Sequence, residues 1–336
     1  MKKELTSLLL LAIVLFGCKE QNISDLPSIV KSAETLADAD TVYTTDEYFI
    51  QNIDIKNGRI ALKNVNDKID IIFLDKDCKG IEDTIMHGAG PLDLLEGSFM
   101  KTCVNDNDSN FVIYDASIGK ILTAKYNPGF STSYKENKDI IHVGELCIGD
   151  SLLVGHPVSS TGLFVITDVD GETIPVEYYL TMSNELKNEL GPSFDMIMRH
   201  NLALNSRKDR ILAFSYYFDA VAVYSTDGKL IRTNRESNDV TEECELIKNA
   251  GEYWLHSNPC ATEDACYVKV TKVIDEKKTD SYLVKYSWNG DLLNAYKFPE
   301  DCSGAYAISA DSKLYCIVAD IKGEEERYHV VSYPLN

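Results

Sequence analysis

The sequence predicts an all-β fold, a six-bladed β-propeller whose last blade is closed by an N-terminal strand. Three observations lead to this prediction. A short strand followed by a turn glycine recurs along the 336 residues, helical periodicity is almost absent after the N-terminal segment, and the last repeat ends before its final strand. Repeats of this kind, each long enough for about four short strands, are typical of propeller blades.

The chain begins with a pattern typical of an export signal. Two lysines near the start precede an apolar run from Leu8 to Phe16, which is followed by Gly17 and Cys18, and even the whole segment from Leu5 to Gly17 has only 13 residues. This run is shorter than the about 20 residues of a membrane-spanning helix, so we interpret residues 1–17 as a signal peptide. The segment from Leu15 to Cys18 resembles a bacterial lipobox. The resemblance implies cleavage before Cys18, lipidation of this residue and attachment to the membrane through its acyl chains.

The remaining chain divides into a tether and one domain. Residues 18–40 are polar with scattered aliphatic side chains, and we interpret them as a lipidated tether that leads into a propeller domain at residues 41–336. Lys19 and Glu20, directly after the lipidated cysteine, resemble signals that direct lipoproteins to the outer membrane. We therefore expect the protein in a bacterial envelope, attached to the outer membrane on its periplasmic side or at the cell surface.

The repeats are recognised by their turns. Asp-Gly and Asn-Gly favour tight turns between antiparallel strands, because both residue types tolerate positive φ. The spacing between successive turn glycines is roughly 40 to 60 residues, which suits one blade each. The only helical pattern in this region runs from Ser183 to Leu190. The turn glycines of the first five predicted blades are Gly80, Gly129, Gly171, Gly228 and Gly290.

The sixth repeat is incomplete. It begins at Ala305 and the chain stops soon after Tyr333, where the turn glycine and the outer strand should follow. A blade without its outer strand would expose unpaired backbone groups along an edge. The β-branched and aromatic segment from Thr41 to Thr45 is our candidate for the missing strand. Two β-sandwich domains are the alternative, but they require neither a repeated turn glycine nor an incomplete last repeat.

A glycine-rich loop follows the predicted outer strand of the first blade. It reads His87-Gly88-Ala89-Gly90-Pro91, and here the chain resembles the TolB-like six-bladed β-propeller lipoproteins of bacterial envelopes. The resemblance implies a lipid-anchored ring and supplies no catalytic residues. Independently of it, Gly90 provides backbone freedom and Pro91 provides rigidity, so we expect a fixed corner between the first two blades.

Candidate ligand-binding residues lie in loops expected on the same face as this corner. Histidine and arginine there could hold an anionic group, and exposed aromatic rings could contact a peptide or sugar. The structural alternatives are histidines that bond the backbone and aromatic rings that pack between blades. The candidates are His87, Gly90, Pro91, His156, Arg199, His200, Tyr217 and Phe218.

The sequence contains few other residues or motifs that point to specific chemistry. The sequence contains nine cysteines, of which Cys260 and Cys266 are the best candidates for a disulfide in an exported protein. It has no Cys-x-x-Cys or His-Glu-x-x-His motif, and near-matches to calcium loops lack the required glycine and glutamate. It also has no Gly-x-Ser-x-Gly motif. We therefore predict neither a metal nor a cofactor.

Charge restricts the function classes. The chain has 33 Lys and Arg against 53 Asp and Glu, and a net charge of −20 argues against nucleic-acid binding. We predict a lipid-anchored envelope propeller that acts as a recognition or scaffolding module for a peptide, glycan or protein partner. The alternatives are a hydrolase or lyase with catalytic groups gathered from several blades at the central channel, and a structural part of an envelope assembly.

Overall fold

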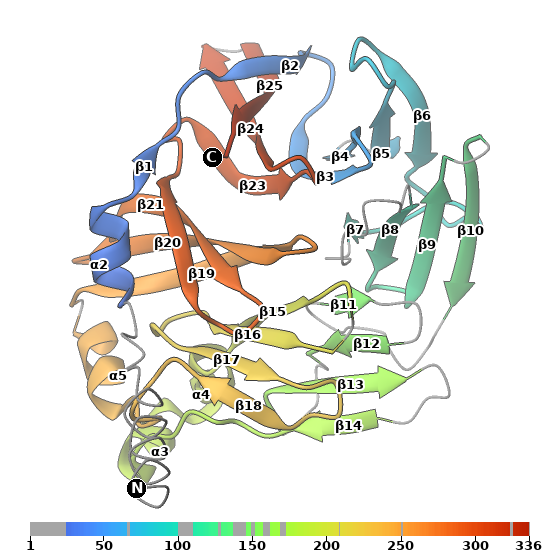
Figure 1. Cartoon of the computed structure of the whole chain (residues 1–336). Helices are drawn as coiled ribbons and strands as arrows, with labels where there is room; N and C mark the ends of the chain where they lie inside the picture. Colours follow the sequence, from blue (N-terminus) through green and yellow to red (C-terminus); the bar gives the residue numbers. More distant parts are fainter. Residues whose placement is uncertain are drawn as a thin grey trace, which may run out of the picture.

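Six β-sheets arranged in a ring form the fold, which confirms the predicted six-bladed propeller (Figure 1). Within each blade, consecutive strands are antiparallel neighbours, and the first strand lies nearest the centre of the ring (Figure 1). The computed structural model describes residues 25–65, 68–99, 110–126, 129–136, 146–148, 152–156, 162–168, 173–207, 209–249, 251–322 and 325–335.

The first four blades each contain four consecutive strands. Blade 1 contains β3 (Ile50–Lys56), β4 (Arg59–Asn64), β5 (Ile69–Leu74) and β6 (Ile81–Met86). Blade 2 contains β7 (Gly97–Phe99), β8 (Asn110–Asp115), β9 (Lys120–Lys125) and β10 (Ser131–Glu136). Blade 3 contains β11 (Leu146–Ile148), β12 (Leu152–Gly155), β13 (Phe164–Asp168) and β14 (Thr173–Val176). Blade 4 contains β15 (His200–Leu204), β16 (Ile211–Ser215), β17 (Val221–Tyr224) and β18 (Leu230–Thr233).

The last two blades include strands from the N-terminal part of the chain. Blade 5 contains β19 (Tyr253–Ala261), β20 (Ala265–Ile274), β21 (Lys277–Ser287) and β22 (Leu292–Lys297), with β1 (Glu34–Thr35) parallel to β22. Blade 6 contains β23 (Cys302–Ile308), β24 (Lys313–Lys322), β25 (Glu325–Pro334) and β2 (Asp40–Thr45).

The ring closes through β2, as the sequence predicts. This strand is antiparallel to β25, with Thr44 opposite His329, and the Thr44 hydroxyl lies 2.9 Å from Nδ1 of His329. The N-terminal strand therefore occupies the position of the outer strand that the sixth repeat lacks. Its pairing satisfies backbone groups that an open edge would leave exposed.

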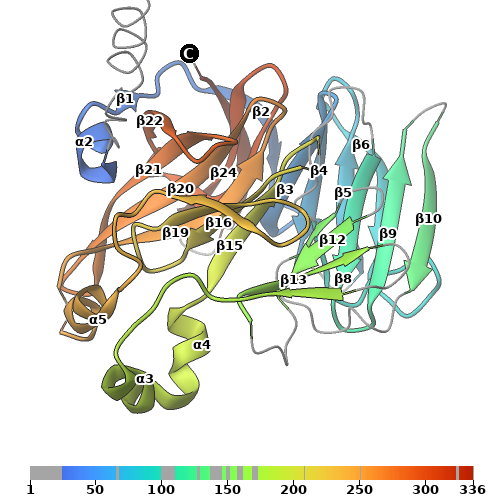
Figure 2. The same cartoon turned by 60° about the horizontal axis from the view of Figure 1, so that its bottom comes forward.

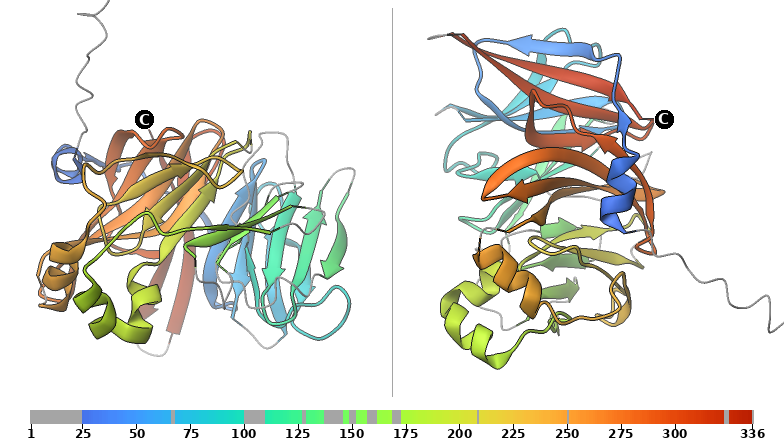
Figure 3. Two further views of the ribbon diagram at one scale, coloured as in Figure 1. Left: turned by 90° about the horizontal axis from the view of Figure 1, so that it is seen from below. Right: turned by 90° about the vertical axis from the view of Figure 1, so that its left-hand side faces the viewer.

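Packed structure begins earlier than the expected boundary at residue 41. Helix α2 (Leu26–Lys31) starts at Asp25, whose carboxylate accepts a hydrogen bond of 3.0 Å from the Ser28 amide. Leu26 and Val30 of this helix are buried in the core shared by blades 4 and 5. Figure 3 shows α2 against the outer edge of blade 5. Residues from Asp25 onward thus belong to the fold and not to the tether.

The turn between the third and fourth strands explains two of the predicted glycines. Gly228 and Gly290 have φ of +81° and +82°, which side chains rarely adopt. A Cβ on Gly228 would also lie 3.3 Å from Ile174 Cγ2 on the neighbouring blade. The turn glycine therefore allows both the turn and its contact with the preceding blade. Gly80 and Gly129 lie in the equivalent connections, and Gly171 lies outside the described residues.

Helices fill two of the connections between blades. Helix α3 (Asn184–Leu190), the 3-10 turn η2 (Gly191–Ser193) and α4 (Phe194–Ile197) precede blade 4, and α5 (Thr241–Lys248) precedes blade 5. Ser183 caps α3, in agreement with the helical pattern in the sequence. An ion pair of 2.7 Å between Lys248 and Glu189 joins α5 to α3. Figure 2 shows these helices projecting together from one side of the ring. In the part of the chain that the structure describes, no helix combines the length and the apolar character needed to cross a membrane.

Candidate functional site

One face of the ring carries the candidate residues. The first strands of all six blades run in the same direction along the axis, so the connections between blades and the loops between second and third strands share one face. We call it the connection face. It includes His87 after β6, His156 after β12, Arg199 before β15 and Tyr217 between β16 and β17. The sequence therefore predicted which loops share a face, although they belong to three different blades.

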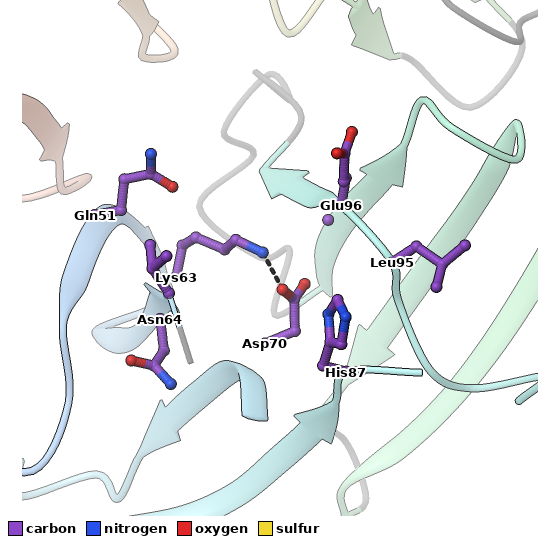
Figure 4. Close-up of a pocket in the computed structure, with 9 residues that line it drawn as sticks. Gln51, Lys63, Asn64, Asp70, His87, Leu95 and Glu96 are labelled. Atoms are coloured by element: carbon purple, nitrogen blue, oxygen red, sulfur yellow. Dashed lines mark hydrogen bonds and ion pairs between the residues drawn. The ribbon is translucent and has the colours of Figure 1, made fainter. Parts of the chain in front are cut away.

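A cavity of about 440 Å³ lies on this face between blades 1 and 2 (Figure 4). Its walls come from the beginning of β3 and β5, the end of β4, the residue after β6 and the connection into β7. Of the sequence candidates, only His87 lines it. The lining residues are Gln51, Lys63, Asn64, Val65, Asp70, His87, Leu95, Glu96 and Gly97.

Asp70 is the central group of this cavity. Its carboxylate is 3% exposed and lies between the Lys63 ammonium and the His87 imidazole (Figure 4). Lys63 donates to Oδ1, whereas Oδ2 has no hydrogen-bond partner among the described residues. Burial raises the pKa of Asp70, although the hydrogen bond and charge of Lys63 oppose the shift. The Gly97 amide approaches the carboxylate closely enough to oppose the pKa shift, but it does not complete a hydrogen bond to Oδ2, so this oxygen can still accept one from a group in the cavity.

Asn64 supplies a second buried acceptor in the cavity lining. It is 1% exposed, and its Nδ2 donates to the Ile69 carbonyl at 2.8 Å. Its Oδ1 has no partner within the described ranges. A buried polar atom without a partner costs about 1–3 kcal/mol, and most such atoms are paired with protein, water or ligand. The cavity is therefore better suited to a hydrogen-bond donor than to an apolar group.

A buried carboxylate holds the connection into β7, which forms one wall of the cavity. Asp115 accepts hydrogen bonds from the amides of Leu95 and Glu96 at 2.6 and 3.1 Å. Burial alone would raise the pKa of Asp115, but hydrogen bonds from Ser117 and these two amides outweigh it and lower the pKa. Because Leu95 and Glu96 both line the cavity, Asp115 fixes the position of its wall.

The Gly90-Pro91 segment forms the predicted corner but is not part of the cavity lining. The Gly90 amide donates to Asp93 Oδ2 at 3.1 Å. The buried Lys120 ammonium donates to the carbonyls of Gly90 and Asp93 at 3.0 and 2.9 Å. A Cβ on Gly90 would displace the Asp93 carboxylate, which here accepts the hydrogen bond from the Gly90 amide. These contacts hold the connection between blades 1 and 2, and Gly90 and Pro91 are therefore positioning residues.

His156 and His200 make hydrogen bonds to the backbone. His156 Nε2 lies 2.6 Å from the His200 carbonyl, and His200 Nδ1 lies 2.7 Å from the Met198 carbonyl. His200 is fully buried, and burial lowers its pKa to about 3, so the ring is neutral at physiological pH. Its place in the core corrects the expectation that it faces a ligand.

The aromatic candidates separate into one buried and one half-buried ring. Phe218 is 1% exposed in the core between blades 3 and 4, so it follows the packing alternative and offers no contact surface. Tyr217 is half-buried, with ring centroids 4.8 Å from Tyr216 and 6.3 Å from Tyr253. Arg199 is exposed nearby. Tyr217 and Arg199 lie on the connection face but do not line the cavity around Asp70.

Cys260 and Cys266, the expected disulfide pair, lie on the neighbouring strands β19 and β20 of blade 5. Cys260 pairs with Tyr267 across the ladder and Cys266 with Ala261, so the two side chains point to opposite sides of the sheet. This placement is unfavourable for a bond between the two sulfur atoms. Cys18 lies outside the described residues.

A second cavity of about 510 Å³ lies beside α3 and α4. Its polar and aromatic groups contact one another: the Tyr178 hydroxyl donates to Asp195 at 3.1 Å, and the Tyr178 and Phe194 rings are 5.5 Å apart. None of the buried polar atoms without a partner in the described chain belongs to its lining residues. Among those same described residues, no cluster of histidine, cysteine and acidic side chains has the geometry of a metal site.

The local sequence around Asp70 indicates a functional residue, although it matches no known motif. Asp70 is the single charged residue in the apolar run of β5, and Lys63 is the only charged residue in β4 after its first position. A charge inside a strand that is buried on both faces is costly unless it is paired or functional. Only the fold shows that the two residues meet and that His87 joins them.

Comparison with known proteins identifies the architecture. No protein family model matches the chain, and no curated protein matches it. A solved member of the DUF4221 family from Bacteroides vulgatus is 11% identical with a TM-score of 0.57, and the match covers 90% of this chain and 98% of that one. A presumed exported protein of Bacteroides fragilis is 13% identical with a TM-score of 0.51, covering 90% and 99%. These similarities support the fold alone, and the TolB-like resemblance remains an expectation.

Proposed function

We propose that this protein is a recognition module of a bacterial envelope and that its ligand site is the cavity around Asp70. The observation that carries the proposal is the buried Oδ2 atom of Asp70, which has no hydrogen-bond partner among the described residues. A hydroxyl or ammonium group of a ligand would donate to this oxygen while Lys63 holds the other. The volume of about 440 Å³ falls in the range of small-molecule sites.

The lining suits a polar ligand unit. Amide, carboxylate, ammonium and imidazole groups surround the cavity, and none of its described lining residues is a phenylalanine, tyrosine or tryptophan. A sugar unit and the amino-terminal residue of a peptide share the required chemistry, which is a hydrogen-bond donor on a small polar group. Both belong to the peptide and glycan partners expected from the sequence. An ammonium ligand would depend on the Asp70 charge and would weaken with salt, whereas a neutral sugar would be less sensitive.

Titration of the full chain in detergent tests the site. The probes are neutral monosaccharides, amino sugars and short peptides, with binding measured by calorimetry. We expect one class to bind and Asp70→Asn to weaken it at least tenfold, which corresponds to about 1.4 kcal/mol. Asp227→Asn is the matched control, because Asp227 lies in a turn on the opposite face and its hydrogen bonds among the described residues come from Ser225 and Lys229 of the same turn. Equal affinity of the Asp70 variant and the wild type would place the site elsewhere.

The proposed anchor is Cys18. Only residues 19–24 separate it from Asp25, where the described structure begins, and α2 then lies against blade 5. A chain lipidated at Cys18 would therefore hold the outer edge of blade 5 near the membrane, since this segment spans at most about 25 Å. Similarity to the presumed exported protein supports an envelope location.

Metabolic labelling with a fatty acid tests the anchor. We expect the wild-type chain to incorporate label and to remain in the membrane fraction. Cys18→Ala should incorporate none, and Cys78→Ala should behave as the wild type. Protease treatment of intact cells then distinguishes surface display, in which the chain is cleaved, from a periplasmic position. Equal labelling of the Cys18 variant and the wild type would exclude the anchor.

Catalysis is a second candidate function of the same cavity. The carboxyl of Asp70 has a raised pKa and lies beside the His87 imidazole, an arrangement that can exchange protons with a bound substrate. Incubation of the probes with the full chain, followed by mass spectrometry, distinguishes binding from turnover. Product formation that disappears in Asp70→Asn would support the enzyme. Ligands recovered unchanged after prolonged incubation would support recognition.

A further inference from the structure

Blade 6 brings two cysteines together that are distant from the sequence candidates for a disulfide. Cys302 is on β23 and Cys316 on the adjacent strand β24. Cys302 pairs with Val318, and Val318 and Cys316 point to the same side of β24 because they are two residues apart. Both cysteines are therefore on one face of the sheet, where the ladder is irregular between Cys302 and Tyr306.

The surroundings of the two thiols agree with this register. Cys302 is 8% exposed and Cys316 is 0% exposed, and both belong to the core cluster between blades 5 and 6. The two side chains are in hydrogen-bond contact, which lowers the pKa of Cys302. Burial and the neighbouring thiol raise the pKa of Cys316. A lowered pKa favours the thiolate, which is the form of cysteine that attacks disulfides.

Cys260 and Cys266 provide the contrast. Their positions in the ladder place them on opposite faces of blade 5, and they belong to different core clusters. Each would have to cross the sheet to reach the other. Disulfide formation depends on the direction of the Cβ atoms more than on separation in sequence. By this criterion the pair in blade 6 is suited to a disulfide, whereas the pair in blade 5 is not.

We propose that Cys302 and Cys316 form a disulfide when the chain reaches the oxidising envelope. The Cys302 thiolate attacks one sulfur of a small-molecule or protein disulfide and releases one thiol. The Cys316 thiolate then displaces the second thiol from the mixed disulfide. The two cysteines together lose two protons and two electrons, and the oxidant leaves as two thiols. This inference rests on the proposed export of the chain.

The bond would stabilise the blade that completes the ring. It links β23 to β24 in the same sheet in which β2 closes the propeller, and it encloses residues 303–315 in a covalent loop. Constraining this loop reduces the entropy of the unfolded chain. Because both thiols are buried in the folded domain, the bond forms during folding, before the core of blade 6 is packed.

Peptide mapping by mass spectrometry tests the proposal. The full chain is produced with its signal segment in a bacterial host, recovered from the membrane in detergent, denatured and alkylated without reductant. A second sample is reduced and then refolded with oxidised glutathione. We expect a peptide pair joined through Cys302 and Cys316 in both samples, and its loss after reduction. The chain in the glutathione sample should have two fewer titratable thiols than the fully reduced chain.

Cysteine variants and the comparison of the two samples distinguish a wrong cysteine pair from a chain that is not exported. Cys302→Ala and Cys316→Ala should each abolish the joined peptides, whereas the control variants Cys260→Ala and Cys266→Ala should retain them. Alkylation of both cysteines in both samples, or a bond from either to another cysteine, would overturn the assigned pair. A bond formed only with glutathione would overturn export to an oxidising compartment while supporting the pair. The wild-type measurement remains valid even if a variant fails to fold.

Discussion

Substitution of Gly97 by alanine tests the packing of the proposed cavity. Gly97 begins β7 and lines the cavity directly beside Asp70. A Cβ at this position would lie 2.5 Å from Asp70 Oδ2, 2.6 Å from Leu94 Cδ1 and 3.2 Å from Ile113 Cγ2. Leu94 and Ile113 are fully buried, so neither can move without disturbing the core. The added methyl group must therefore displace the Asp70 carboxylate or strain the core.

We expect Gly97→Ala to lower the free energy of unfolding by about 1–3 kcal/mol, the usual cost of overpacking a core. Urea unfolding of the full chain, followed by tryptophan fluorescence, measures this change. Gly129→Ala is the matched control, because a Cβ there meets no atom within 4 Å. We expect the control to stay within about 0.5 kcal/mol of the wild type. The substitution should also weaken binding of any ligand that depends on Asp70.

Equal unfolding free energies for Gly97→Ala and Gly129→Ala would refute the reasoning. They would mean that Asp70 and Leu94 do not approach Gly97 as the structure shows. Loss of stability with unchanged ligand affinity would instead retain the packing but place the ligand away from Asp70. The two measurements therefore test the geometry of the cavity and its proposed use separately.

Three further predictions concern the fold. Deletion of residues 40–46 removes β2 and should prevent cooperative folding, whereas an unchanged unfolding midpoint would show that the ring does not need this strand. Phe73→Ala should cost about 3–5 kcal/mol, because the buried Phe73 ring packs against three others at 5.4–5.7 Å; a cost below 1 kcal/mol in urea unfolding would contradict this packing. Burial lowers the pKa of His256 to about 4. As the pH falls, His256 is therefore protonated in the unfolded chain before it is protonated in the folded one. The free energy of unfolding should fall between about pH 6.5 and pH 4, by up to roughly 3 kcal/mol. His256→Phe should reduce the change of the urea unfolding midpoint with pH. The same change with pH in the variant and the wild type would refute this role of His256.

Some elements of this protein were determined by local sequence. The turn glycines mark hairpins because positive φ is a property of one residue and its neighbours. The incomplete sixth repeat predicted a closing strand, since backbone groups at a sheet edge require partners wherever the edge lies. Helix α3 was visible from its periodicity and its Ser183 cap. The cue for α2 was also local, an Asp25 cap followed by Pro27, but the segment was interpreted as tether.

The functional groups required tertiary structure. Lys63, Asp70 and His87 come from β4, β5 and the residue after β6, and no spacing rule places them around one cavity. Burial decided the roles of Phe218 and His200, because a loop residue can point outward or into the space between blades.

The cysteines show the same division between sequence and fold. Their number and the export signal suggested a disulfide from sequence alone, but the choice of partners depended on strand register. A shift of one residue along a strand reverses the face to which a side chain points. Register therefore separates Cys260 from Cys266 and brings Cys302 beside Cys316. The sequence by itself determined the repeat and its closure, which depend on local backbone preferences and unpaired edges, and only the tertiary structure decided which side chains meet.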